Sequence, residues 1–152
     1  MAIIGDLVHS RVSKSNIWGL TKLGAEVCVS GPPTLLLPDV EKFGVDVYYD
    51  AREAVNNADV ILTTRMRLET QDKTFLPSLD EYKRFFRIDE NLLRYAKKDA
   101  IVMHPGPVNR GVELTGKVID HEKSRIEEQV FSGIAVRMAV LKLLNDYREY
   151  TK

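Results

Sequence analysis

Short apolar runs alternate along the chain with longer stretches in which apolar and polar residues are mixed. Five runs of three to five residues are rich in β-branched and other apolar side chains, and they span residues 2–4, 26–29, 45–49, 60–62 and 101–103. Continuous apolar runs of this length are typical of strands that are buried on both faces, as in a parallel sheet. The pattern therefore predicts five strands that pair in parallel.

The stretches between and after these runs carry apolar residues at helical spacing. They predict helices over residues 15–23, 39–43, 50–57, 79–86, 90–98 and 124–147. Gly24 and Gly44 are natural C-terminal stops, and Asp50 is a natural N-cap with Glu53 as its capping-box partner. The last helix has an apolar stripe with a spacing of three or four residues: Ile126, Val130, Ile134, Met138, Leu141 and Leu144.

The alternation of strands and helices predicts one α/β domain over residues 1–152. We expect a Rossmann-like, doubly wound parallel sheet of about five strands in the order 3-2-1-4-5, with flanking helices. Ligands bind such a sheet beyond the carboxyl ends of the strands, where the strand order reverses. That point lies between the first and fourth strands, so the crevice faces segments 6–15, 63–71 and 104–113. The longest irregular stretch, 64–79, is of a length often seen in functional loops.

Arg11 lies in the middle of the first of these segments, among hydroxyl side chains that can begin a helix. The backbone N–H groups at a helix N-terminus and a nearby guanidinium together form a site for an anion. The alternative is an ordinary N-cap at Ser13 or Ser15, with Arg11 facing solvent, since capping serines are common.

Arg65 and Arg67 follow the fourth predicted strand. An arginine directly after a buried strand is costly unless it meets an anion, and residues two apart point the same way in an extended chain. Together with Arg11, these side chains could hold two carboxylates through bidentate hydrogen bonds. The alternative is that they form surface ion pairs with Glu69 and Asp72.

The fifth predicted strand is followed by the turn His104-Pro105-Gly106-Pro107. Two prolines around one glycine restrict the backbone, and an X–Pro peptide bond in such a turn can be cis. A turn of this kind directs backbone carbonyl and N–H groups into a crevice. The alternative interpretation is a rigid turn without a ligand.

Composition narrows the function classes. The 22 Lys and Arg residues balance the 22 Asp and Glu residues, which argues against a nucleic-acid-binding surface. No apolar run approaches the ~20 residues that a membrane helix needs. Cys28 is the one cysteine, so an internal disulfide is impossible and we expect a reducing, cytoplasmic location. His9, His104 and His121 lack the spacing of metal ligands, and no phosphate-binding glycine motif is present, so we expect no metal and no cofactor.

Four stretches of the chain carry a family resemblance. They read GDLVHSRVSKSN (5–16), ADVILTTRMRLE (58–69), IVMHPGPVNRGVEL (101–114) and EKSRIEEQVFSGIAVRMAVL (122–141). In these stretches, and nearly from end to end, the chain resembles the C-terminal, aspartate-binding domain of aspartate carbamoyltransferases. The resemblance implies transfer of a carbamoyl group from carbamoyl phosphate to the α-amino group of L-aspartate in pyrimidine biosynthesis, without a metal or redox cofactor.

The resemblance also implies roles for individual residues. Arg11 would bind a carboxylate of aspartate, and Arg65 would bind the side-chain carboxylate. The turn at Gly106 and Pro107, with a cis proline, would hold the amino groups of both substrates through backbone carbonyls. Substrate recognition would then rest on paired arginines and on positioning by the backbone, not on covalent catalysis.

Two positions depart from the family pattern. Arg67, which we also expect to contact the substrate, replaces a glutamine that touches aspartate, and Thr70 replaces an arginine that steadies the loop. These departures support one alternative, a non-catalytic amino-acid-binding homologue. Another alternative is an ornithine-type carbamoyltransferase domain, which has a His-Cys-Leu-Pro turn and an acidic residue for its cationic substrate. The basic loop at Arg65 favours a substrate with two negative charges.

The resemblance leaves out the N-terminal half of the family's chain. That half carries the carbamoyl-phosphate motif, a catalytic histidine and most contacts of a homotrimer. We therefore expect the chain to be inactive alone and to work with that half in a homotrimer, by itself or with other pyrimidine enzymes. In the family, the last helix packs on the N-terminal domain. We expect part of its stripe to face solvent here, and the helix to be mobile or held by a partner chain.

Overall fold

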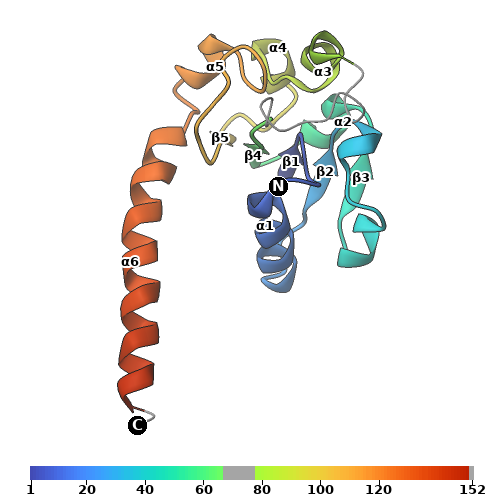
Figure 1. Ribbon diagram of the computed structural model, residues 1–152. Coiled ribbons are helices and arrows are strands. Elements are labelled where there is room, and N and C mark those ends of the chain that lie inside the picture. Colours follow the sequence, from blue (N-terminus) through green and yellow to red (C-terminus); the bar gives the residue numbers. More distant parts are fainter. Residues whose placement is uncertain (67–77, 151–152) are drawn as a thin grey trace.

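Five short strands form one parallel sheet in the computed structural model, which describes residues 1–66 and 78–150 (Figure 1). The strands are β1 (Ala2–Ile4), β2 (Cys28–Ser30), β3 (Asp46–Tyr48), β4 (Val60–Thr63) and β5 (Ile101–Met103). They lie in the order β3-β2-β1-β4-β5, and Ile3 of β1 is in register with Val29 of β2 and Leu62 of β4. The predicted doubly wound α/β fold is thus confirmed, with the reversal of strand order between β1 and β4.

Six α-helices and two short 3₁₀ helices connect or follow the strands in the described residues. The α-helices are α1 (Arg11–Lys22), α2 (Ala51–Val55), α3 (Leu79–Phe86), α4 (Glu90–Leu93), α5 (Gly116–Ile119) and α6 (Ile126–Tyr150), and the 3₁₀ helices are η1 (Pro33–Leu35) and η2 (Val40–Phe43). Helix α3 has the predicted bounds, and α2 begins after the predicted cap, Asp50. The sequence pattern did not predict η1 or α5, because each is a single short turn.

Helix α4 ends at Leu93, five residues before the predicted end at residue 98. The chain beyond it is bound to the segment that leads into β4. Asn57 N–H donates to the carbonyl of Tyr95 at 3.0 Å, and Lys97 N–H donates to the carbonyl of Ala58 at 3.2 Å. These long-range hydrogen bonds use backbone groups that a longer helix would need for itself, so the helix stops early.

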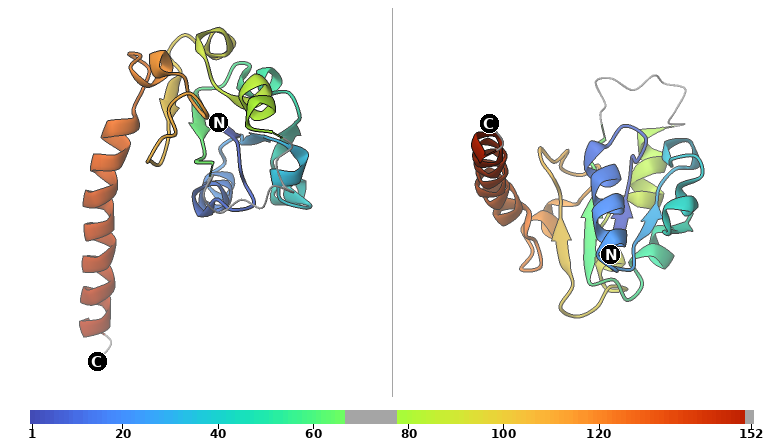
Figure 2. Two further views of the ribbon diagram at one scale, coloured as in Figure 1. Left: turned by 45° about the horizontal axis from the view of Figure 1, so that its top comes forward. Right: turned by 90° about the horizontal axis from the view of Figure 1, so that it is seen from below.

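Alternate residues of the strands enter two apolar clusters on opposite faces of the sheet, because successive strand residues point to opposite faces. Ile4 and Ile61 belong to the cluster that contains residues of α2, α3 and α4. Ile3 and Leu62 belong to the cluster that contains residues of α1 and η2. Figure 2 shows these helices on the two sides of the sheet. The sheet is therefore covered on both faces, and its carboxyl-end edge is where loops meet.

Helix α6 projects away from the sheet as a long rod (Figures 1 and 2). Ile126 at its start is buried, but Val130 is 50% exposed and Met138 is 66% exposed. The remaining residues of the predicted stripe are exposed as well: Ile134, Leu141 and Leu144. The expected solvent exposure of this stripe is confirmed, whereas the mobility of the helix stays a prediction. Across the described parts of the chain, no helix combines the length and apolarity needed to span a membrane.

Candidate functional site

The three segments that were predicted to face the crevice meet at one cavity of about 230 Å³. Its wall is formed by residues that follow β1, β4 and β5: His9, Ser10, Arg11, Val12, Arg65, Pro105 and Gly106. Three predicted site residues, Arg11, Arg65 and Gly106, therefore lie together. Pro107 follows Gly106 but is not among the residues that line the cavity, and Arg67 lies outside the described residues.

The segment after β1 turns sharply before it enters α1. Gly5 has a φ of +123°, and a Cβ there would lie 2.6 Å from the hydroxyl of Thr64, so this close approach of two loops requires glycine. Asp6 is fully buried and accepts hydrogen bonds from His9 N–H at 2.9 Å and from His9 Nδ1 at 2.9 Å. The buried carboxylate thus orients the imidazole at the wall of the cavity.

Ser10 is the N-cap of α1, because its hydroxyl accepts a hydrogen bond from Ser13 N–H at 3.1 Å. The alternative of an N-cap at Ser13 or Ser15 is wrong, since the helix begins four residues earlier than the apolar pattern indicated. Arg11 consequently stands in the first turn, where the N-terminal N–H groups carry partial positive charge. Its side chain is exposed and at the same time lines the cavity.

The segment after β4 is tied to the segment after β1. Thr64 N–H donates to the carbonyl of Ile4 at 2.9 Å, which continues the sheet by one residue, and the Thr64 hydroxyl donates to the carbonyl of Asp6 at 3.2 Å. Arg65 follows at the point where the chain leaves the sheet, and it is half-buried. The bonds of Thr64 fix the place from which the Arg65 side chain enters the cavity wall. The alternative partners of this loop, Glu69 and Asp72, lie outside the described residues.

The segment after β5 is held by its own first residue. His104 is fully buried, its backbone N–H donates to Gln129 Oε1 at 2.9 Å, and its Nδ1 accepts from Gly106 N–H at 2.9 Å. Burial, and to a lesser degree the positive charge of Arg65, lowers the pKa of His104 to about 4, so the ring is neutral at neutral pH. The Gly106–Pro107 peptide bond is cis, as the sequence suggested, and Gly106 has a φ of +68°.

The cavity offers two guanidinium groups and a wall of turn backbone. Guanidinium groups bind carboxylates in a planar, bidentate geometry, and backbone carbonyls can accept hydrogen bonds from an amine. In the wall, the Ser10 hydroxyl serves as the helix cap, and His9 is paired with Asp6. Among residues 1–66 and 78–150, no group of three or more His, Cys, Asp or Glu side chains is placed to hold a metal ion. The arrangement suits binding and orientation of a small anion that carries an amine.

Sequence reasoning missed three residues of this region. Asp6 is buried and pairs with the exposed His9 at the cavity wall, and Glu113 is a fully buried carboxylate beside the loops. Asp6 could have been found, because an acidic residue two positions after a buried strand is costly without donors. Glu113 lies within a segment predicted to face the crevice, but nothing in its immediate sequence context signals burial.

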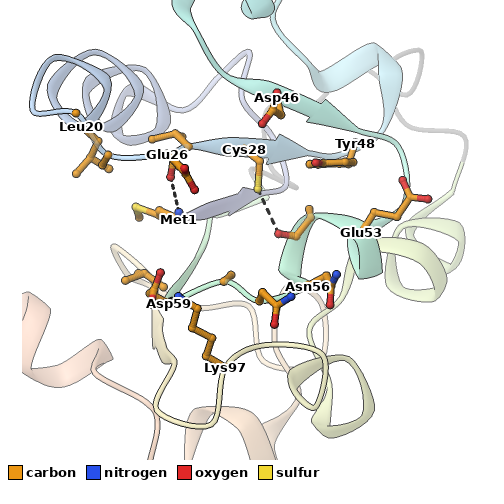
Figure 3. Close-up of a pocket in the computed structure, with 17 residues that line it drawn as sticks. Met1, Leu20, Glu26, Cys28, Asp46, Tyr48, Glu53, Asn56, Asp59 and Lys97 are labelled. Carbon is orange, nitrogen blue, oxygen red and sulfur yellow. Dashed lines mark hydrogen bonds and ion pairs between the residues drawn. The ribbon is translucent and has the colours of Figure 1, made fainter.

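A larger cavity of about 600 Å³ lies at the opposite, amino ends of the strands (Figure 3). The Cys28 thiol points toward α2 there and donates to the carbonyl of Ala54 at 3.2 Å. Burial raises the pKa of this thiol, so it is protonated at neutral pH and a poor nucleophile. Nearby, Lys97 forms an exposed ion pair with Asp59 at 2.7 Å. Two arginines line the smaller cavity, whereas the charged side chains that line this larger one are mostly acidic: Glu26, Asp46, Glu53, Asp59 and Lys97.

Comparisons with known proteins identify the family of the chain. The family described as aspartate/ornithine carbamoyltransferase, Asp/Orn binding domain, matches residues 1–144. The chain is 58% identical over 144 residues to the aspartate carbamoyltransferase catalytic subunits of Ruminiclostridium cellulolyticum and Acetivibrio thermocellus, covering 95% of this chain and 46% of each relative. It thus spans about half the length of these curated relatives. An ornithine carbamoyltransferase from Pyrococcus furiosus is similar in structure, with a TM-score of 0.77 and 29% identity, over 92% of this chain and 47% of that one.

Proposed function

Because the chain belongs to the aspartate/ornithine carbamoyltransferase family, as its Asp/Orn binding domain, we propose that it is the L-aspartate-binding half of an aspartate carbamoyltransferase. The complete enzyme would transfer a carbamoyl group from carbamoyl phosphate to L-aspartate in de novo pyrimidine biosynthesis. The observation that carries the proposal is the position of Arg11, Arg65 and Gly106 around one cavity at the carboxyl ends of β1, β4 and β5.

In this proposal the two arginines bind the two carboxylates of aspartate, with Arg65 on the side-chain carboxylate. The backbone of the turn at Gly106 and Pro107 accepts a hydrogen bond from the α-amino group and aims its lone pair. The amine nitrogen attacks the carbamoyl carbon of carbamoyl phosphate, the bond from that carbon to the phosphate oxygen breaks, and phosphate and the amine proton leave. The residues described here supply orientation, which is a large part of the rate in such a reaction.

The charge of the cavity wall favours aspartate over ornithine. The wall contains two arginines and no carboxylate among its described lining residues, whereas the cationic side chain of ornithine needs an acidic partner. The turn that begins at His104 also has Pro105 and Gly106 where the ornithine-type turn has cysteine and leucine. The relatives with the highest identity reported above are named for aspartate, which supports the same choice. Ornithine remains the competing substrate in the test.

The missing groups would come from the other half of the enzyme. By the resemblance, that half would carry the carbamoyl-phosphate motif and the catalytic histidine, and the complete enzyme would be a homotrimer. We therefore propose that this chain has no transferase activity alone and that the exposed stripe of α6 packs on the N-terminal half. Steady formation of carbamoyl-aspartate by the pure chain, above the uncatalysed rate, would contradict this part of the proposal.

A calorimetric titration tests the binding function directly. The chain is titrated with L-aspartate, with succinate, which lacks the amine, and with L-ornithine. We expect aspartate and succinate to bind and ornithine to bind at least about tenfold more weakly.

The Arg65→Ala variant should lose most of the affinity for both dicarboxylates. Its control is Arg52→Ala, since Arg52 is an exposed arginine paired with Asp50 at 2.7 Å on another part of the surface. Preference for ornithine would support an ornithine-type domain, and tight dicarboxylate binding without activity in the completed enzyme would support a non-catalytic homologue.

A further inference from the structure

A buried carboxylate connects the two loops that carry Arg65 and Gly106. Glu113 is fully buried, and its Oε1 accepts hydrogen bonds from Met66 N–H at 2.7 Å and from Asn109 Nδ2 at 2.8 Å. Its Oε2 accepts a hydrogen bond from Asn109 N–H at 2.8 Å. We refer to Met66, Asn109 and Glu113 as the Glu113 cluster.

Both backbone polar groups of Met66 are bound by side chains of the loop after β5. Its N–H group donates to Glu113, and its carbonyl accepts from Asn109 Nδ2 at 2.8 Å. The Met66 side chain is itself fully buried. The backbone immediately after Arg65 is therefore anchored by the Met66 side chain and by the facing loop, although Met66 and Glu113 are 47 positions apart in the sequence.

The other end of the cluster holds the turn. Asn109 lies two residues after Pro107, and its N–H and side-chain amide both donate to Glu113. The turn is thus held from two sides, by the hydrogen bond from Gly106 to His104 at its start and by the Glu113 cluster at its end. Because the cluster binds the residues next to Arg65 and next to Pro107, it sets the separation of the two loops across the cavity.

A fully buried carboxylate is costly to place, and burial raises the pKa of Glu113 while the hydrogen bonds from Met66 and Asn109 oppose that rise. Three N–H donors use both oxygens of the group, which suits an ionised carboxylate because a protonated one would lose an acceptor position. An apolar side chain could fill this space but could not join two loops. The presence of a buried carboxylate at position 113 is therefore explained by its hydrogen bonds to the loops after β4 and β5.

We propose that Glu113 is a positioning residue for dicarboxylate binding, which holds Arg65 at a set separation from the turn at Gly106 so that both can contact one substrate molecule. The proposal rests on the function proposed above. Arg65 supplies the charge in this arrangement, and the Glu113 cluster supplies its location. A residue that acts in this way affects affinity and the local geometry of both loops together.

Three variants and one control test the proposal. Glu113→Ala removes all three acceptor bonds, Glu113→Gln keeps the shape and one acceptor oxygen, and Asn109→Ala removes the side-chain bonds but keeps Glu113. The control is Glu90→Gln, because Glu90 is also a carboxylate with side-chain partners, Thr115 at 3.0 Å and Lys117 at 3.2 Å, but it does not line the cavity. The measurements are backbone amide hydrogen exchange, the amide resonance of Gly106, and the aspartate affinity by calorimetry.

We expect Glu113→Ala to speed exchange at Met66 and Asn109 by at least about tenfold, to shift the Gly106 resonance, and to weaken aspartate binding by about tenfold or more. Glu113→Gln and Asn109→Ala should show smaller changes of the same kind, and Glu90→Gln none. If Glu113→Ala does not fold, these two variants decide the question in its place. Graded effects of this kind would distinguish positioning from a general loss of stability.

Unchanged exchange at Met66 and Asn109 in the Glu113 variants would overturn the proposal. Faster exchange with unchanged aspartate affinity would also overturn it, because the cluster would then be structural only. If the unmodified chain binds no aspartate, the proposed function fails. The Gly106 resonance then decides the positioning role alone: a shift in Glu113→Ala supports the role, and an unshifted resonance overturns it.

Discussion

The two cavities at opposite ends of the same parallel strands differ in how their walls are built. The cavity at the amino ends has about 600 Å³, and the one at the carboxyl ends has about 230 Å³. At the amino ends, Asp59 and Lys97, which are 38 positions apart, form an exposed ion pair at 2.7 Å. At the carboxyl ends, the buried Asp6 carboxylate fixes its own loop, and the buried Glu113 carboxylate holds the loops after β4 and β5 against each other. The candidate site is therefore distinguished by buried carboxylates that fix its loops, and not by its volume.

The direction of the chain explains this contrast. In a parallel sheet, every strand delivers the residue that follows it to the same edge, so Arg11, Arg65 and Gly106 converge although they are far apart in sequence. Reversal of strand order between β1 and β4 sends the connections away to both sides and leaves room there. The amino ends receive chains that arrive from helices, and there backbone hydrogen bonds join the connections that lead into β4 and β5, from Asn57 to Tyr95 and from Lys97 to Ala58.

The largest expected difference between the two cavities is the loss of kcat/KM when one cationic side chain is removed from each, Arg65 or Lys97. In the complete enzyme, Arg65→Ala should cost about 2–4 kcal/mol of transition-state stabilisation, because it removes one member of a buried charge pair with the substrate. Lys97→Ala at the amino-end cavity should leave kcat/KM within about twofold of the unchanged enzyme. Steady-state kinetics of carbamoyl-aspartate formation measures both. Similar losses in the two variants would remove the distinction between the cavities.

The second largest expected effect concerns His104 beside the carboxyl-end cavity, and it is a pH dependence of the free energy of unfolding. The pKa of His104 is lowered from the ordinary value of 6.5 to about 4, so the unfolded chain binds this proton first as the pH falls. Stability should therefore drop between pH 6.5 and pH 4, by about 3 kcal/mol for this group, and it should be unaffected by this group above pH 7.

The His104→Asn variant isolates this contribution. Its unfolding free energy in urea should depend less on pH than that of the unchanged chain over the same range. The control is His121→Asn, since His121 is more exposed and also accepts a backbone N–H bond, from Lys123 at 3.1 Å. This control should keep the pH dependence of the unchanged chain. Identical slopes in the two variants would show that His104 does not carry the effect.

A smaller effect is expected at the start of α1. Ser10→Ala removes the side-chain cap and should lower the free energy of unfolding by about 1 kcal/mol. It should also weaken dicarboxylate binding, since the first turn presents Arg11 to the cavity. Urea unfolding and calorimetry measure these two quantities. Ser15→Ala, at an exposed position inside the same helix, is the control, and an equal loss there would argue against a special role of the cap.

The smallest effect should come from the amino-end cavity. Cys28→Ala removes a weak thiol hydrogen bond and should change stability by less than about 1 kcal/mol, without changing aspartate affinity. Because burial raises the pKa of the thiol, alkylation at neutral pH should be much slower in the folded chain than in urea. Rapid alkylation in the folded state, or weakened aspartate binding in the variant, would show that this cavity is more reactive than its structure indicates.

Prediction from the sequence succeeded for elements whose pattern is local. The bounds of β1, β5 and α3 were predicted correctly, because short apolar runs and a helical period are visible without tertiary contacts. The start of α1 and the end of α4 were wrong. The first depends on the Ser10 cap, and the second depends on hydrogen bonds from the segment at Asn57 and Ala58, which the apolar pattern does not contain.

The α/β class, the strand order and the segments that carry Arg11, Arg65 and Gly106 were predicted from the sequence. These three residues converge because residues that follow parallel strands gather at one edge of the sheet. How these residues are held depends on contacts between distant parts of the chain. The contact from Glu113 to Met66 joins positions 47 apart, and the exposure of α6 depends on what packs against it. Local periodicity reveals neither feature, because both depend on residues that are distant in the sequence. A buried polar group such as the Glu113 carboxylate is stable only when its distant hydrogen-bond partners are in place.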